Sequence, residues 1–215
     1  MKNKAFTLLE STVVLLVTTL IIGSAITFTS LNRSYQKFNE ERLNLFQDIK
    51  NLANLSLKGG EFVLNNNTST VCGVGLLYSS STKTITFIAY ATVSTNTVIS
   101  CYEIASSSIE EFNFVNKSPN IYLTKNFEYT TNSENAFKKE LSYITKLDFN
   151  TNTSPIIQNF ATFSLMFLSL SSEPIIFIDN MRFFVNFKDF NINLYFRNEE
   201  ASKIIIKKTG QTLLQ

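Results

Sequence analysis

The sequence predicts an α+β protein, in which one long N-terminal helix precedes a C-terminal antiparallel β-sheet or β-sandwich domain. Two observations predict this fold class. Residues 5–32 form an apolar stretch whose single charged residue is Glu10. After residue 60 the pattern changes to short apolar or alternating segments separated by Ser, Thr and Asn, which is typical of strands and their connections.

The apolar stretch is long enough to cross a membrane. At about 1.5 Å per residue, a helix over residues 5–32 measures about 40 Å, whereas a hydrocarbon core is about 30 Å thick. Lys2 and Lys4 precede the stretch and Arg33 is the first basic residue after it, so the positive-inside rule places residues 1–5 in the cytoplasm and the rest of the chain outside. A cleaved secretory signal fits poorly, because its apolar core is only about 7–15 residues long and ends in a small-residue cleavage pattern.

The helix is expected to continue as an amphipathic segment. Beyond residue 32, apolar side chains recur in steps of three and four, which indicates one face of a helix. The series runs through Leu31, Tyr35, Phe38, Arg42, Leu45, Ile49 and Leu52. Lys58 followed by Gly59 and Gly60 supplies a cationic last turn and a glycine stop. A helix from Phe6 to about Lys58 would be about 80 Å long.

Strands are predicted through the rest of the chain. They cover residues 61–64, 73–78, 84–91, 98–103, 111–115, 121–129, 160–170, 175–178, 182–187, 192–196 and 203–208, with a turn at Thr209-Gly210 and a short last strand. Residues 132–147 are predicted to form a short helix or a long loop. The second apolar stretch, residues 160–170, is too short to span a membrane as a helix, so we expect a buried strand. Gly73 and Gly75 lack the spacing of a phosphate-binding loop and indicate a bulge or a tight entry into a strand.

Composition excludes several kinds of catalytic and metal-binding site. The chain has no His, so a Ser-His-Asp or Cys-His site and a His-ligated metal are excluded. Two cysteines cannot make a four-Cys zinc site. A formal net charge of +2 does not indicate a nucleic-acid binder, and Asp189–Asn193, which offers oxygen ligands, alternates like a strand rather than a calcium loop. We therefore expect no catalytic residue, no metal, no cofactor and no direct nucleic-acid binding.

The N-terminal motif adds a family resemblance. Residues 4–10, KAFTLLE, followed by the apolar helix, resemble the N-terminal signature of type IV pilins and type II secretion pseudopilins. The resemblance implies that a prepilin peptidase cleaves between Ala5 and Phe6 and methylates the new amine of Phe6. Glu10 matches the hallmark acid at the fifth mature position. The family usually has Gly before the cut, and Ala5 is the smallest alternative, which implies retained but slower cleavage.

The resemblance also implies an organisation and a function. Residues 1–5 would be the leader, 6–31 the transmembrane and filament-core helix, 32–58 its amphipathic continuation, and 59–215 an extracytoplasmic β-rich domain, together the pilin lollipop. The chain would be a structural subunit of a secretion pseudopilus, a type IV pilus or a DNA-uptake filament, and no enzyme. Its partners would be other pilin or pseudopilin subunits, the prepilin peptidase, the inner-membrane assembly platform and membrane lipid.

Features of the β region support the same family. The segment 72–91 and the C-terminal segment 204–214 are similar to those of H-type minor pseudopilins. The alternative from another class is an uncleaved, signal-anchored binding or sensor protein whose β domain recognises a ligand outside the cell.

Glu10 is the one charged residue of the apolar stretch and a candidate site residue. A carboxylate in an apolar helix costs about 2–3 kcal/mol at the membrane centre, so Glu10 is expected to pair with an ammonium at the start of a mature helix, its own or a neighbour's. The competing interpretation is an acid that merely reaches the interface.

Cys72 and Cys101 both lie outside the membrane by the charge argument, and each is beside a predicted strand. We expect them to form a disulfide. The alternative is two buried thiols.

Overall fold

A computed structural model describes residues 8–59, 61–64, 67–91, 121–151, 157, 160–169, 174–179, 181–182 and 188–215. The chain divides into two compact units, Met1–Glu40 and Glu41–Gln215. One long N-terminal helix and antiparallel sheets confirm the predicted α+β class. The strands predicted at residues 98–103 and 111–115 lie outside the described residues.

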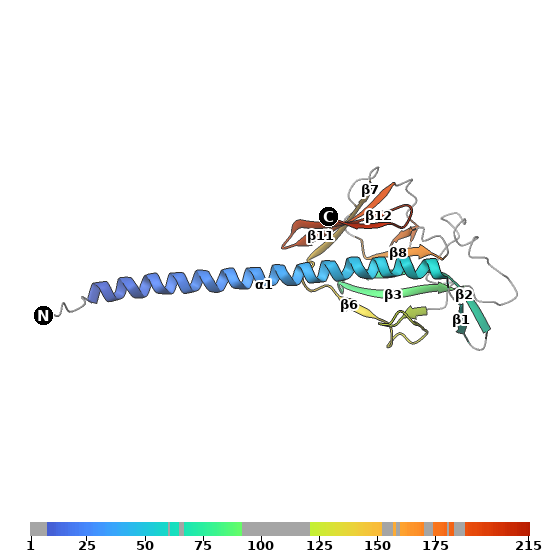
Figure 1. Cartoon of the computed structure of the whole chain (residues 1–215), viewed down its shortest axis with the longest axis horizontal. Helices are drawn as coiled ribbons and strands as arrows, with labels where there is room; N and C mark the ends of the chain where they lie inside the picture. The colour runs from blue at the N-terminus through green and yellow to red at the C-terminus, as the bar shows by residue number, and fades with distance from the viewer. Residues whose placement is uncertain are drawn as a thin grey trace. The chain divides into compact units, whose positions relative to one another are not determined.

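Helix α1 runs from Leu8 to Lys58, 51 residues (Figure 1). It ends where the sequence predicts. Gly59 adopts a φ of 64°, a left-handed conformation that glycine reaches without steric cost, and its N–H donates to the Ser56 carbonyl at 3.2 Å. The first glycine of the pair is therefore the stop signal.

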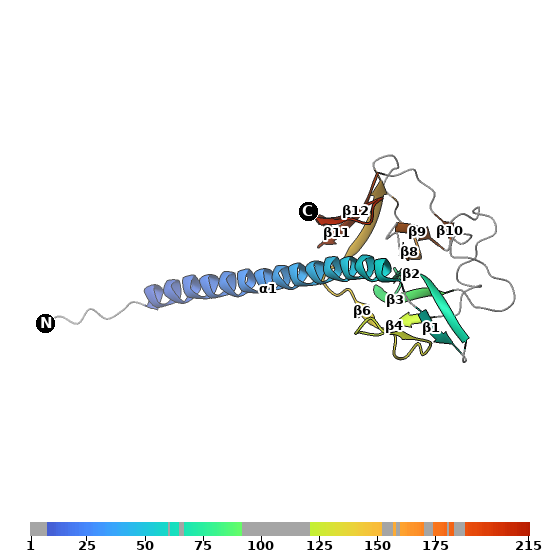
Figure 2. The ribbon, with the colours of Figure 1, turned by 45° about the vertical axis from the view of Figure 1, so that its right-hand side comes forward.

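The last part of α1 belongs to the second unit and carries part of its core. Leu45, Ile49, Leu52 and Ala53 are at most 6% exposed, and they share one face because residues three and four apart are neighbours on a helix. This part of the helix runs alongside β3 (Thr84–Ala91) in both views (Figure 1, Figure 2). The predicted apolar series is thus confirmed at Leu45, Ile49 and Leu52.

The strands of the second unit form two antiparallel sheets. The larger sheet contains β1 (Glu61–Leu64), β2 (Asn67–Ser79), β3, β4 (Ile121–Leu123), β5 (Tyr129–Thr130), β6 (Lys138–Glu140), β8 (Thr162–Leu168), β9 (Pro174–Ile178) and β10 (Met181–Arg182). Its order is β10-β9-β8-β2-β3-β4-β5, with β1 paired to β2 and β6 to β3. The smaller sheet has the order β13-β12-β11-β7, built from β7 (Lys146–Thr151), β11 (Asp189–Phe196), β12 (Glu199–Lys207) and β13 (Thr212–Leu214).

The centre of the larger sheet requires glycine. The pairing of β2 with β3 shifts its register between Val71 and Gly73, which is the bulge that the two glycines predict. A methyl group at Gly75 would overlap the Leu165 carbonyl oxygen on β8 and lie 2.8 Å from the Met166 Cα. The backbones of β2 and β8 therefore approach so closely that no side chain fits at this position.

Phenylalanine rings join the two sheets. Phe149 on β7 stacks on Phe163 of β8 with ring centroids 3.9 Å apart, and Phe190 on β11 lies 5.8 Å from Phe163 at an interplanar angle of 4°. All three side chains are at most 1% exposed. Such aromatic pairs contribute about 0.5–1.5 kcal/mol each beyond their burial. The stack is the contact through which the smaller sheet packs on the larger one.

Three predictions about the strands require correction. Residues 121–129 are not one strand, because a turn in which Phe127 adopts a φ of 61° separates β4 from β5. Residues 132–147 are neither helix nor simple loop: they contain β6, which pairs with β3, and the start of β7. Strand β7 was missed, although Leu147 and Phe149 alternate with polar Lys146, Asp148 and Asn150 in the pattern of a strand.

Two carboxylates of α1 bind β6 and the connection that follows it. Glu41 accepts the backbone N–H groups of Ser142, Tyr143 and Ile144 at 2.7–2.8 Å. Two turns further along the same face, Asp48 binds the Lys139 ammonium at 2.7 Å. Because successive N–H groups converge on one carboxylate, the segment is a small anion-binding nest filled by the protein's own side chain.

The first prediction concerns Gly75. Replacing it by Ala should destabilise the second unit by at least about 2 kcal/mol, because the new methyl group meets backbone atoms that cannot move without separating β2 from β8. Thermal unfolding of the full chain in detergent, followed by near-ultraviolet circular dichroism, measures the effect. The control is Gly23→Ala, where the added carbon meets nothing within 4 Å and the helix should gain up to about 1 kcal/mol. Equal unfolding temperatures for the two variants would contradict the close approach.

The second prediction concerns Glu41. Glu41→Ala should cost about 1–3 kcal/mol, because it removes an ionised acceptor shared by three backbone donors. Chemical denaturation measures the loss, and amide hydrogen exchange should speed up at Ser142, Tyr143 and Ile144 in particular. Glu40→Ala removes the same charge from the neighbouring exposed position and should change neither quantity. Unaltered exchange in Glu41→Ala would refute the role of the carboxylate.

Candidate functional site

The first part of α1 exposes apolar side chains on every side. Within the described chain the exposed large side chains include Leu8, Leu9, Val13, Val14, Leu15, Leu16, Val17, Leu20, Ile21, Ile22, Ile26 and Phe28, each at least 46% exposed. An amphipathic surface helix would confine such residues to one stripe. This segment is therefore apolar all round, which suits a lipid environment or the core of an assembly rather than water.

Seven hydroxyl groups in this segment are satisfied within the helix, and Ser30 is an exception. The side chains of Thr12, Thr18, Thr19, Ser24, Thr27, Thr29 and Ser34 donate to carbonyl oxygens three or four residues earlier, at 2.8–3.0 Å. These seven hydroxyl donors thus have partners without water, as an apolar surrounding requires. The abundance of Thr does not weaken the membrane interpretation.

Length and composition allow α1 to cross a membrane. It is the one helix of the described chain that is long and apolar enough to do so, with a mean hydropathy of 2.1 in its most apolar window. Leu8 and Arg33 are separated by about 37 Å along the axis, compared with about 30 Å for a hydrocarbon core. Which side of the membrane each end occupies stays a prediction.

The predicted assembly charge lies at the start of this segment. Glu10 is in the first turn of α1, with an exposed side chain. Acidic residues are stabilised there by the partial positive charge of the helix N-terminus. Ala5 and Phe6, between which cleavage is predicted, lie outside the described residues. The structure therefore positions Glu10 and leaves the cleavage site as a prediction.

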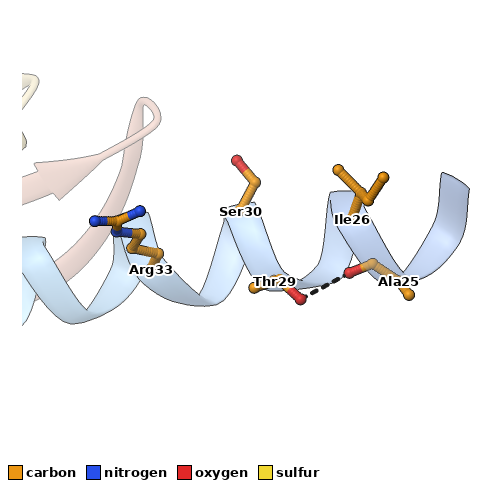
Figure 3. Close-up of a pocket in the computed structure, with 5 residues that line it drawn as sticks. All are labelled: Ala25, Ile26, Thr29, Ser30 and Arg33. Atoms are coloured by element: carbon orange, nitrogen blue, oxygen red, sulfur yellow. Dashed lines mark hydrogen bonds between the residues drawn. The ribbon is translucent and has the colours of Figure 1, made fainter. Parts of the chain in front are cut away.

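A depression in the helix surface lies near the other end of the apolar segment. It is lined by Ala25, Ile26, Thr29, Ser30 and Arg33, all from α1 (Figure 3). The side chains of Ile26, Ser30 and Arg33 lie on the same side of the helix, whereas the Thr29 hydroxyl turns back to the Ala25 carbonyl at 2.8 Å. Sequence reasoning used Arg33 only to orient the chain and missed this grouping, although the spacing of four and three residues could have indicated it.

Cys72 lies in the core of the larger sheet. It is 1% exposed, is disulfide-bonded, and belongs to a cluster with Tyr90, Met166, Ile175 and Phe177. Burial raises the pKa of the Tyr90 hydroxyl, which therefore stays neutral inside this cluster. Cys101 lies outside the described residues, so its pairing with Cys72 stays a prediction.

A charged cluster on β7 and β11 is the strongest rival as a chemical site. The Lys146 ammonium binds the fully buried Asp148 carboxylate at 2.9 Å and lies 5.1 Å from the centre of the Tyr195 ring. Burial and the neighbouring Asp148 carboxylate raise the pKa of Tyr195 to about 12. The charges of Lys146 and Asp148 compensate each other within β7, beside neutral Tyr195 on the paired strand β11, so the cluster is best explained as a stabilising network for the smaller sheet.

The oxygen ligands of residues 189–193, and those of Asp179 earlier in the chain, have structural roles. Asp179 accepts the N–H groups of Ala161 and Thr162 at 2.8 and 2.9 Å and so joins the turn after β9 to the start of β8. Residues 189–193 lie in strand β11, as the alternation predicts. Among the described residues, no three Cys, Asp or Glu side chains are grouped closely enough to hold a metal ion.

Comparison of the chain with protein-family models, with characterised proteins and with solved structures finds no match in any of the three.

Proposed function

We propose that the chain is a membrane-inserted structural subunit of a type IV pilus-like or type II secretion-like filament, processed by a prepilin peptidase and assembled through its N-terminal helix. The observation that carries the proposal is a helix whose first 25 or so described residues expose apolar side chains on all sides and include one acid, Glu10, in the first turn. In this proposal the chain performs no chemistry, and its β domain lies outside the cytoplasmic membrane.

The exposed apolar surface suits both the membrane-inserted subunit and the subunit packed in a filament. In the membrane, lipid chains cover the side chains of α1. When a subunit leaves the bilayer, the same surface must be buried again, because exposing it to water costs about 25 cal/mol per Å². Packing α1 against the equivalent helices of other subunits provides that burial, so other copies or related subunits are the partners that this surface requires.

Glu10 supports assembly rather than insertion. A lone carboxylate near the membrane interior is unfavourable, so a sequence selected only for anchoring has no use for it. In a packed bundle of helices, the amine at the start of a processed helix needs a counter-charge, and a carboxylate one turn inside the N-terminus supplies it. We infer that Glu10 sets the register between neighbouring helices.

The third prediction tests processing. Intact mass measurement of the membrane-extracted chain should show loss of residues 1–5 and the gain of one methyl group on Phe6. Ala5→Leu should block cleavage and leave an uncut precursor, because a bulky residue before the cut does not fit the peptidase. An uncut, unmethylated wild-type chain would instead favour the signal-anchored binding or sensor protein.

The fourth prediction tests Glu10. Glu10→Val should give a cleaved, folded, membrane-resident subunit that enters filaments poorly, because losing one member of a buried charge pair costs about 3–5 kcal/mol. Glu10→Asp should be intermediate, since it keeps the charge on a shorter side chain. The measurement is the fraction of the chain that co-purifies with sheared filaments or with the initiating complex.

Glu40→Val is the matched control, because it removes the same charge from an exposed position on the same helix. It should assemble like the wild type. Incorporation of Glu10→Val at the wild-type level would show that Glu10 merely reaches the interface.

A further inference from the structure

The depression on α1 is lined by apolar side chains, a hydroxyl group and a guanidinium group, in this order along the helix. Ala25 and Ile26 offer apolar surface, Ser30 follows one turn later with a hydroxyl, and Arg33 follows with a guanidinium (Figure 3). Residues 26, 30 and 33 are spaced by four and three, so they form one face of the helix. The face therefore changes from apolar to cationic over about 10 Å along the axis.

The two polar groups of this face have no partner in the described chain. Neither the Arg33 guanidinium nor the Ser30 hydroxyl makes a hydrogen bond or ion pair with any residue that the structure describes. The neighbouring hydroxyls behave differently: Thr27, Thr29 and Ser34 donate back to the helix. Ser30 thus lies beside Arg33 with its hydroxyl available to an external acceptor.

The position of Arg33 along the helix matches the edge of a bilayer. Arg33 lies about 37 Å from Leu8, which is about 7 Å more than the hydrocarbon core and within the 40–45 Å that includes both headgroup layers. With Leu8 at one boundary of the hydrocarbon, Arg33 lies among the headgroups of the opposite leaflet. Tyr35, which is 49% exposed, lies just beyond it at the level where amphipathic aromatic residues collect.

We propose that this face binds one phospholipid, with the phosphate on the Arg33 guanidinium, the glycerol region beside the Ser30 hydroxyl, and an acyl chain along Ile26 and Ala25. Arg binds phosphate through parallel N–H donors, and its aliphatic stem lies along the apolar surface below. The order of groups on the helix is the order of groups in the lipid. The site fixes the depth of α1 in the membrane.

The inference rests on the membrane-spanning part of the proposed function and not on filament assembly. A chain that never enters a filament still has this site, so a failure of assembly and a failure of lipid binding are distinguishable. Filament incorporation and lipid retention are measured separately on the same preparations.

The fifth prediction is tested by native mass spectrometry of the full, disulfide-intact chain in a mild detergent. The chain is titrated with phosphatidylglycerol and, separately, with a monogalactosyl diacylglycerol of the same acyl chains. The wild type should retain one phosphatidylglycerol in preference to the galactolipid. Arg33→Gln should lower the apparent affinity for phosphatidylglycerol about fivefold, the effect of one cationic residue at a membrane surface, and leave the galactolipid unchanged.

Two further variants sharpen the test. Ser30→Ala should lower retention of phosphatidylglycerol by a smaller factor, because it removes one neutral donor. Lys50→Gln removes the same charge from an exposed position on the same helix and should have no effect. Far-ultraviolet circular dichroism confirms that the helix of each variant is intact.

Three results would overturn the proposal. The first is equal retention of phosphatidylglycerol by the wild type and Arg33→Gln. The second is equal retention of the two lipids by the wild type, or of neither. The third is displacement of the bound lipid by millimolar inorganic phosphate, which would show that the guanidinium takes phosphate itself rather than a lipid headgroup.

Discussion

One constraint governs the first part of α1: a helix with apolar side chains on all sides can enter an apolar surrounding only if its polar groups have partners without water. The backbone meets it through the regular hydrogen bonds of α1, and Thr and Ser meet it by donating back to the preceding turn. Ser30 is an exception, because its hydroxyl makes no hydrogen bond to any residue that the structure describes, and it lies near Arg33 on the same face of the helix.

In the second unit the helix is amphipathic: one face of the last part of α1 is buried in the core that it shares with the sheets. Leu45, Ile49 and Leu52 turn one face of α1 into part of the core. Asp48 binds β6, and Glu41 binds the β6–β7 connection, which leads from the larger sheet to the smaller one. The stacked rings of Phe149, Phe163 and Phe190 then join the sheets. Apolar packing supplies the stability, and the carboxylates fix which segment lies against the helix.

Sequence reasoning worked where a local signal was strong. The helix end at Gly59, strand β3 and the buried strand within residues 160–170 follow from glycine chemistry, alternation and length, and all are confirmed. It failed where pairing between distant segments decides the structure. Strand β6 has little strand character of its own and exists because β3 offers it hydrogen bonds. The reason for Gly75 lies on β8, about ninety residues away, and only the assembled sheet reveals it.

The pairing of β2 with β8 and the ring of Phe190 also determine how much of the chain must be synthesised before the second unit can finish folding. Strand β2 ends at Ser79 and its neighbour β8 begins at Thr162, and the last member of the aromatic stack comes from β11. Contacts so distant along the chain form slowly, because closing a long loop costs conformational entropy before the contact contributes any free energy. The β domain can therefore complete its core only after almost the whole chain has been synthesised. Until then its strands have unpaired edges, and unpaired edges are prone to aggregation.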